Sequence, residues 1–281
     1  MVVRQSLFQR ILLYISVVLI CLFFSGPFIV MSINMFRQDR DLYRPQNFPF
    51  WFNDPPVLDH LQLLFNNTNF LVFLRNSAVV GVLVVIITLL IAIPAAYSLA
   101  RLTGSWGERA GIAIFLVYLV PPTLLFLPLF RIVVALGLND TLWSLVVVYP
   151  TITIPFSTWL LMGFFKSIPP DLEEAARIDG ASRTGAFIKV VLPLSGSGII
   201  AVVVSSFTLT LHEFIYALTF ISSSDQRTIS VGIPTELIRG DVFFWQSLSA
   251  ATVLVALPVG FVYNLVLDRL IQGFTLGAVK G

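Results

Sequence analysis

Long apolar segments constrain this chain more than any other feature of its sequence. Six stretches of mostly apolar residues occur, at positions 11–33, 76–99, 110–130, 142–165, 198–221 and 248–267. A helix needs about 20 such residues to cross the hydrocarbon core of a bilayer. The pattern therefore predicts an all-α, polytopic membrane protein with six transmembrane helices, formed as a single transmembrane domain over residues 1–281.

The overall composition supports this class and excludes others. Hydrophobic residues make up 57% of the 281 positions and charged residues only 11%, whereas soluble domains are about 25% charged. The 25 phenylalanines also argue against disorder. Soluble enzymes and nucleic-acid-binding proteins are thereby excluded, and membrane lipid is the expected surrounding.

The distribution of basic residues predicts the orientation in the membrane. Six spans place both termini on one side, and cytoplasmic loops carry an excess of Lys and Arg. The terminal side holds ten of these residues, at positions 4, 10, 101, 109, 166, 177, 183, 189, 269 and 280. The opposite side holds seven, at positions 37, 40, 44, 75, 131, 227 and 239. Both termini are therefore expected to be cytoplasmic.

Prolines interrupt the third and fourth expected spans. They stand at positions 121, 122, 128, 150 and 155. Each proline frees a backbone carbonyl that needs an internal partner in lipid. These helices are therefore expected to pack in a bundle.

The cytoplasmic connection at residues 166–197 is the most informative loop. Pro169 and Pro170 can start a helix, and Gly180 is a natural residue just past its end. Ser182 can cap a second helix over residues 183–192, which Pro193 ends. This predicts a helix-turn-helix element. On these grounds alone, it could be an amphipathic element lying at the membrane or a docking site for a cytoplasmic protein.

A family resemblance lies in the same loop. Glu174-Ala175-Ala176, then Gly180, then Val190 and Leu192-Pro193 resemble the EAA loop of ABC transporter permeases, with Val in place of Ile. Further matching stretches are Asp179–Ser182, Asn76-Ser77, Ala96–Arg101 and the end of the chain at 277–281. The chain resembles permeases of the binding-protein-dependent carbohydrate importer type, such as the smaller permease of maltose importers.

The resemblance implies a function and a set of partners. It implies a permease subunit in the plasma (inner) membrane of a prokaryote, which imports a sugar or related polar solute. A second permease would pair with it, with a heterodimer favoured, alongside two ATPase subunits and an extracytoplasmic solute-binding protein. The residues implied in coupling to the ATPase are Glu173, Glu174, Ala175, Ala176, Asp179, Gly180 and Ala181.

No catalytic chemistry is expected on this chain itself. The sequence contains no phosphate-cradling Gly-x-x-x-x-Gly-Lys-Ser/Thr motif and no His-Glu-x-x-His or Gly-x-Ser-x-Gly motif. We therefore expect no catalytic residue, no metal site and no bound cofactor, with ATP and Mg²⁺ held by the partner ATPase subunits.

The fifth expected span contains the clearest intramembrane ionisable group. Such groups are costly in lipid and often functional. Glu213 follows His212, and Tyr216 lies near it on the same helical side. These three residues either line the path of a polar solute or make internal contacts. The other histidine, His60, is expected to be a solvated loop residue.

Two other functional classes remain as alternatives at this stage. A secondary transporter or channel would work without an ATPase, but it leaves the cytoplasmic loop without a role. A membrane enzyme would need a cluster of ionisable residues at one depth, and only His212-Glu213 approaches that. Co-purification with an ATPase separates both from the permease.

Overall fold

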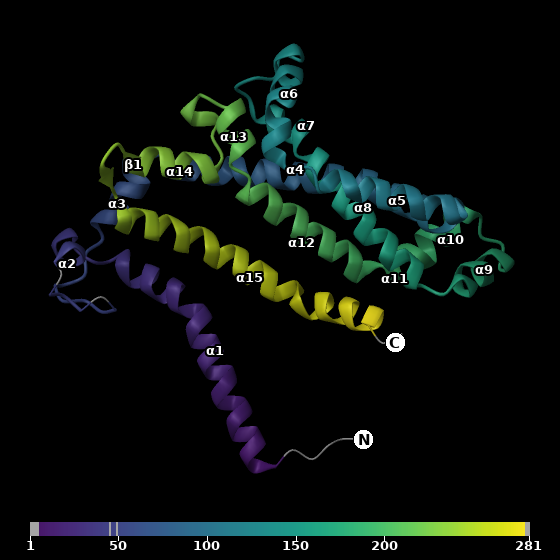
Figure 1. The fold of residues 1–281 in the computed structure, drawn as a ribbon, viewed down its shortest axis with the longest axis horizontal. Helices are drawn as coiled ribbons and strands as arrows, with labels where there is room; N and C mark the ends of the chain where they lie inside the picture. The colour runs from purple at the N-terminus through teal and green to yellow at the C-terminus, as the bar shows by residue number, and fades with distance from the viewer. Residues whose placement is uncertain (1–5, 45, 49, 279–281) are drawn as a thin grey trace. The chain divides into compact units, whose positions relative to one another are not determined.

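The computed structural model describes residues 6–44, 46–48 and 50–278, with side chains up to residue 267. Arg4, Lys280 and the last three residues of the 277–281 stretch therefore lie outside the described residues. The chain divides into two compact units (Figure 1). The first comprises residues 1–70 and 233–258, and the second comprises residues 71–232 and 259–281.

The first unit combines a long apolar helix with a small irregular cap. Its elements are α1 (Leu7–Asn34), α2 (Asp39–Tyr43), α3 (Asp59–Asn66), β1 (Ile238–Arg239), β2 (Val242–Phe243) and the start of α15 (Trp245–Ala278). The two strands form an antiparallel hairpin that pairs Ile238 with Phe243. Helix α1 begins at a capping box of Ser6 and Gln9 and buries none of its residues. Its apolar surface is what a helix in lipid requires.

A buried ion pair organises the cap of the first unit. The Arg37 guanidinium donates to Asp41 at 3.0 and 3.2 Å, and Asn53 donates to the same carboxylate. The bonds with Arg37 hold the pKa of Asp41 well below its usual range. His60 is buried in α3 and contacts the Arg37 carbonyl at 2.9 Å. The expectation of a solvated His60 was therefore wrong, because residues distant in sequence cover it.

The second unit is a bundle of helices and short helical turns. Its elements are α4 (Phe70–Tyr97), η1 (Ser98–Leu102), α5 (Gly104–Tyr118), α6 (Pro122–Ala135), α7 (Leu142–Val148), α8 (Pro150–Ser167), α9 (Pro170–Ile178), α10 (Arg183–Ala186), η2 (Phe187–Val191), α11 (Leu192–Leu194), α12 (Gly196–His212), α13 (Ile215–Phe220) and η3 (Ser224–Gln226). Helix α14 (Ile229–Leu237) and helix α15 contribute residues to both units. Helices α5 and α8 lie side by side (Figure 1).

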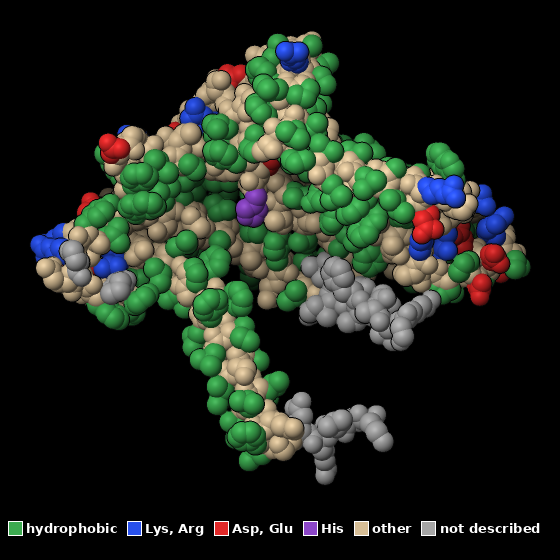
Figure 2. Space-filling model, viewed as in Figure 1, with side chains coloured by type: hydrophobic (Ala, Val, Ile, Leu, Met, Phe, Trp, Pro, Cys, Tyr) green, Lys and Arg blue, Asp and Glu red, His purple; other side chains and the backbone are tan. Residues whose placement is uncertain are grey.

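Among the residues that the structure describes, four helices are long and apolar enough to cross a membrane. They are Leu7–Asn34, Phe70–Leu102, Leu142–Ser167 and Trp245–Leu267. Two bent pairs, Gly104–Tyr118 with Pro122–Ala135 and Arg183–Leu194 with Gly196–His212, bring the number to six if each pair is one span. In Figure 2, hydrophobic side chains cover much of the surface over α5 and α8, as lipid contact requires.

The third and fifth expected spans depart from continuous helices. The third is bent by 89° between Tyr118 and Pro122, where Pro121 and Pro122 stand. A proline disfavours helical geometry at the preceding residue, which accounts for the break. The fifth stops at His212 and resumes at Ile215. Both breaks need polar groups to satisfy the freed backbone atoms.

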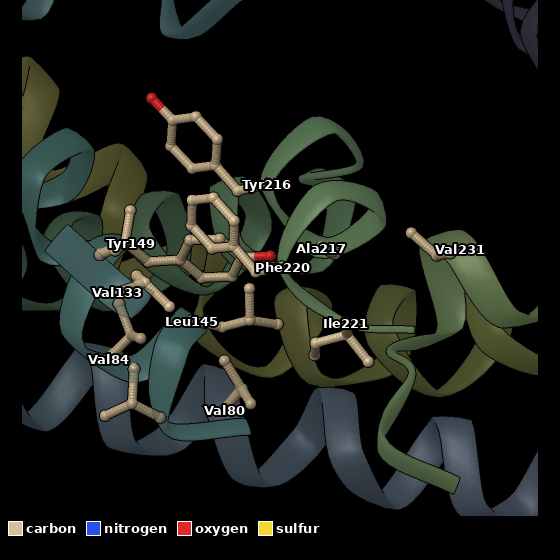
Figure 3. Packing of buried hydrophobic residues seen from close by; sticks show 12 residues of the cluster. Val80, Val84, Val133, Leu145, Tyr149, Tyr216, Ala217, Phe220, Ile221 and Val231 are labelled. Atoms are coloured by element: carbon tan, nitrogen blue, oxygen red, sulfur yellow. The ribbon is translucent and has the colours of Figure 1, made fainter. Parts of the chain in front are cut away.

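Two apolar clusters hold the second unit together. One joins α4, α6, α7 and α13, where Val80, Val133, Leu145, Tyr216 and Phe220 are buried (Figure 3). The other is formed by α4, α8, α12 and η2 and includes Ala92, Ala96, Tyr97, Leu161, Phe165, Val191 and Val202. Close-packed clusters of this kind are barely compressible and transmit strain.

Candidate functional site

The loop between α8 and α12 forms the helix-turn-helix element that the sequence predicts. Helix α9 begins with Pro170 at its first position. It ends at Ile178, and Gly180 follows two residues later with a φ of +92°, which is accessible to glycine at little cost. The Gly180 N–H donates to the Arg177 carbonyl at 3.1 Å, and the Ala181 N–H donates to the Ala176 carbonyl at 3.0 Å. These two bonds form a Schellman motif and fix the turn.

The second helix of the loop is capped as expected but is not uniform. The Ser182 hydroxyl accepts from the Gly185 N–H at 3.1 Å, which starts α10. A π-helical turn, η2, follows at Phe187–Val191, and α11 ends at Leu194. The expectation that Pro193 ends this helix was therefore wrong, because Pro193 sits at an N-terminal position of α11, where its missing N–H costs nothing.

Six of the seven predicted coupling residues lie at least partly exposed. Glu174, Ala175, Asp179 and Gly180 are exposed, while Ala176 and Ala181 are half-buried. The apolar side chains of Leu172 and Ile178 are also exposed, Ile178 to 86%. Figure 2 shows Lys, Arg, Asp and Glu side chains gathered at the end of the second unit that holds α9 and α10. The loop thus presents a mixed charged and apolar surface.

Glu173 is the exception among these seven residues. Its side chain is buried and points into its own chain, where it accepts a hydrogen bond from the Tyr97 hydroxyl. The Arg101 Nε lies 3.8 Å from the other carboxylate oxygen. Sequence reasoning missed Tyr97 and Arg101 as partners. The sequence did contain a hint: Tyr97 and Arg101 stand one helical turn apart, in the Ala96–Arg101 stretch that also carries the family resemblance.

A cavity of about 330 Å³ lies beside the break in the fifth expected span. Its walls are mostly apolar and include Ile152, Leu209 and Phe214, together with His212 and Glu213. A mostly apolar cleft with a few convergent polar groups is typical of a small-molecule site.

The Glu213 carboxylate satisfies backbone groups at the break between α12 and α13. The Tyr216 and Ala217 N–H groups donate to its two oxygens at 2.8 and 3.0 Å, so Glu213 caps the start of α13. The Tyr149 hydroxyl donates to the same carboxylate at 2.8 Å. The Glu213 carboxylate therefore makes internal contacts and also lines the cavity. Tyr149 is a third residue that sequence reasoning missed, and no local signal indicated it.

His212 and Tyr216 occupy different surroundings around this break. His212 is exposed, and its Nδ1 contacts the Thr208 carbonyl at 2.9 Å. Tyr216 is buried, and its hydroxyl donates to the Pro122 carbonyl at 3.1 Å, at the start of α6. The two helix breaks are thus joined by one hydrogen bond. Within the residues that the structure describes, no group of three His, Cys, Asp or Glu could hold a metal ion.

Comparison with known proteins identifies close sequence relatives. The family described as "Binding-protein-dependent transport system inner membrane component" matches residues 73–275. The sulfoquinovosyl glycerol transport system permease protein SmoH of Agrobacterium fabrum is 38% identical over 82% of this chain and 81% of its own length. The trehalose/maltose transport system permease protein MalG of Thermococcus litoralis is 32% identical over 99% of both chains.

Solved structures support the same fold at lower identity. A chain of a bacterial ABC transporter involved in the import of alginate matches with a TM-score of 0.77. The match covers 94% of this chain and 98% of that chain at 19% identity. A bacterial alginate ABC transporter in complex with a pentasaccharide-bound periplasmic protein matches with a TM-score of 0.64 at 16% identity.

Proposed function

This chain belongs to the family of binding-protein-dependent transport system inner membrane components, and we propose that it is the permease subunit of an ATP-driven sugar importer. With a second permease, it forms the path by which a sugar or related polar solute crosses the inner membrane. Separate ATPase subunits bind ATP and Mg²⁺, hydrolyse the nucleotide and move this chain. Both termini lie in the cytoplasm.

The exposed loop at α9 and α10 is the observation that carries this proposal. An interfacial helix without a protein partner is usually basic, because the cytoplasmic leaflet is anionic. Helix α9 and its turn expose Asp171, Glu174 and Asp179 against Arg177. The second helix of the loop exposes Arg183 and Lys189 instead, so the acidic surface is that of α9. This acidic surface, with Leu172 and Ile178 exposed beside it, suits a basic groove on an ATPase subunit better than a lipid surface.

The names of the relatives support a carbohydrate as the solute. SmoH is named for sulfoquinovosyl glycerol and MalG for trehalose and maltose. The cavity beside Glu213 is the place we propose for the solute path. His212 would offer its exposed ring there, while Glu213 and Tyr216 hold the cavity wall in shape through the contacts described above.

Two further partners complete the proposed importer. The alginate importer is described in complex with a periplasmic protein, which supports an extracytoplasmic solute-binding protein for this chain. A second, different permease subunit would pair with this one, because the resemblance is to one member of a two-permease set. Helix α1, which buries none of its residues, has apolar surface available for a partner helix or for lipid.

Purification and reconstitution test this proposal directly. The tagged chain is purified from its native membrane, the co-purifying subunits are identified, and ATP-dependent uptake of labelled maltose, trehalose and sulfoquinovosyl glycerol is measured in proteoliposomes. We expect an ATPase subunit in the complex and uptake of at least one sugar only with ATP. Uptake without ATP, or a pure preparation that contains no ATPase, would contradict the proposal and favour a secondary transporter or channel.

A charge reversal locates the proposed ATPase contact. Glu174→Lys should abolish ATP-driven uptake and lower the amount of co-purifying ATPase while leaving the membrane insertion of the chain unchanged. Glu174 is exposed, so the loss would report on the partner. Wild-type uptake by this variant would remove Glu174 from the interface.

A further inference from the structure

The end of α4 and the turn η1 that follows it are attached to α9 and to the residues just before it. The Tyr97 hydroxyl donates to Glu173, and the Arg101 Nη2 donates to the Ile168 carbonyl at 2.5 Å, just before α9 begins. Arg101 also places its Nε 3.8 Å from Glu173. Glu173 is 8% exposed. One long apolar helix is therefore linked by polar contacts to both the approach and the first turn of α9.

Tyr97 extends this attachment to two more elements. Its ring lies 4.2 Å from the ring of Phe187 in η2 and 6.1 Å from that of Phe165 in α8, centroid to centroid. Tyr97 itself is 7% exposed. Such aromatic contacts add stabilisation beyond simple burial. Four elements, α4, α8, α9 and η2, therefore meet at this single side chain.

Both helices that border this attachment contain a π-helical turn. The turn η1 (Ser98–Leu102) follows Tyr97 directly and contains Arg101, and η2 (Phe187–Val191) contains Phe187. Such π-helical turns are rare in proteins and frequently occur at functional sites. Their presence on both sides of Tyr97 distinguishes this junction from ordinary helix packing.

We infer that Glu173 is a positioning residue that transmits displacement of α9 to α4 through Tyr97 and Arg101. Adjacent glutamates on α9 thus have separate tasks: Glu174 faces outward to a partner, and Glu173 holds the permease's own helix. Pulling α9 away from α4 would take the buried Glu173 carboxylate away from its hydrogen-bond donor, the Tyr97 hydroxyl, and from the Arg101 charge, which is costly. The two helices therefore move together when α9 is displaced. This inference rests on the proposed function, because it assumes that an ATPase displaces α9.

Two conservative variants test the transmission role. Tyr97→Phe removes the hydroxyl and keeps the ring packed against Phe165 and Phe187, while Glu173→Gln removes the charge and keeps the size. Tyr263→Phe is the matched control, because the Tyr263 hydroxyl also makes an internal contact in this unit, with Thr208. The amount of assembled complex, the rate of ATP hydrolysis and the sugar taken up per ATP are measured for each reconstituted variant.

Transmission predicts a specific pattern among these three quantities. Loss of a charge-assisted hydrogen bond shifts an equilibrium by about ten- to a hundredfold. We therefore expect Tyr97→Phe and Glu173→Gln to lower uptake per ATP about tenfold or more while assembly and hydrolysis persist. Uptake per ATP in the double variant should be no lower than in the more affected single variant, since both substitutions break the same contact. Tyr263→Phe should match the wild type.

Three outcomes would overturn the inference, and each is distinct. Wild-type uptake per ATP in both variants would show that the contact transmits nothing. A parallel fall of assembly, hydrolysis and uptake would assign Glu173 and Tyr97 a purely structural role. If the wild-type complex itself shows no ATP-driven uptake, the proposed function fails before any variant is compared, and the inference falls with it.

Discussion

Replacing Gly180 by alanine isolates the contribution of one turn to the order of the loop. Gly180 has a φ of +92°, and a Cβ added there would meet no atom within 4 Å. The cost of Gly180→Ala is therefore that of the backbone conformation alone, about 1–2 kcal/mol. Reduced freedom of the unfolded chain returns about 0.4–1 kcal/mol. The net local destabilisation is then about 1 kcal/mol, or roughly a fivefold change in the opening equilibrium.

Native-state hydrogen exchange of the assembled complex measures this change. We expect amides between positions 176 and 186 to exchange about fivefold faster in Gly180→Ala. Gly180→Asn should lie between that variant and the wild type, because asparagine tolerates positive φ better than alanine. Gly163→Ala is the control, since Gly163 lies inside α8 and also has no atom within 4 Å of an added Cβ. Unchanged exchange in Gly180→Ala would refute the strain argument.

Three further predictions concern other parts of the second unit. Hydrogen bonds from Ser223 and Ser222 lower the pKa of Asp140 below its ordinary 3.8, so its stabilisation is present above about pH 4 and lost as pH falls through the folded pKa. The melting temperature of Asp140→Asn should therefore fall less between neutral and acidic pH than that of the wild type. Gly232→Ala would put a Cβ 2.4 Å from the ring of buried Phe73 and should cost about 1–3 kcal/mol, read as a lower melting temperature. Glu213→Ala removes the acceptor of Tyr149 and of two backbone N–H groups. It should also lower the melting temperature, by the equivalent of about 1–3 kcal/mol. An unchanged melting temperature in Gly232→Ala or in Glu213→Ala would contradict the contact assigned to that residue.

The loop was predictable because its signals are local. Pro170, Gly180 and Ser182 each specify the backbone within one helical turn of themselves, and the structure places all three as predicted. The apolar segments were predictable for a similar reason, since the length and composition of a segment decide whether it can span a bilayer. In both cases, the sequence carries the cause within a short window.

Features that depend on distant residues could not be predicted. Prolines in the third expected span indicated a disturbance, but the 89° bend depends on which neighbours satisfy the freed carbonyls. The burial of His60 results from contacts with Arg37 and Ser247, which are far away in sequence. The inward direction of Glu173 likewise depends on Tyr97, 76 residues earlier.

Glu173 and Glu174 point in opposite directions, and this affects how a permease of this kind could come to work with a different ATPase subunit. Outward residues of α9 would adapt to a new ATPase surface with little effect on the permease, because their side chains are exposed. Glu173 would have to stay with Tyr97 and Arg101 of the same chain. A chimera that receives the outward face of a foreign α9 but keeps its own Glu173 should therefore accept the foreign ATPase more readily than one that receives the whole helix with a different residue at that position.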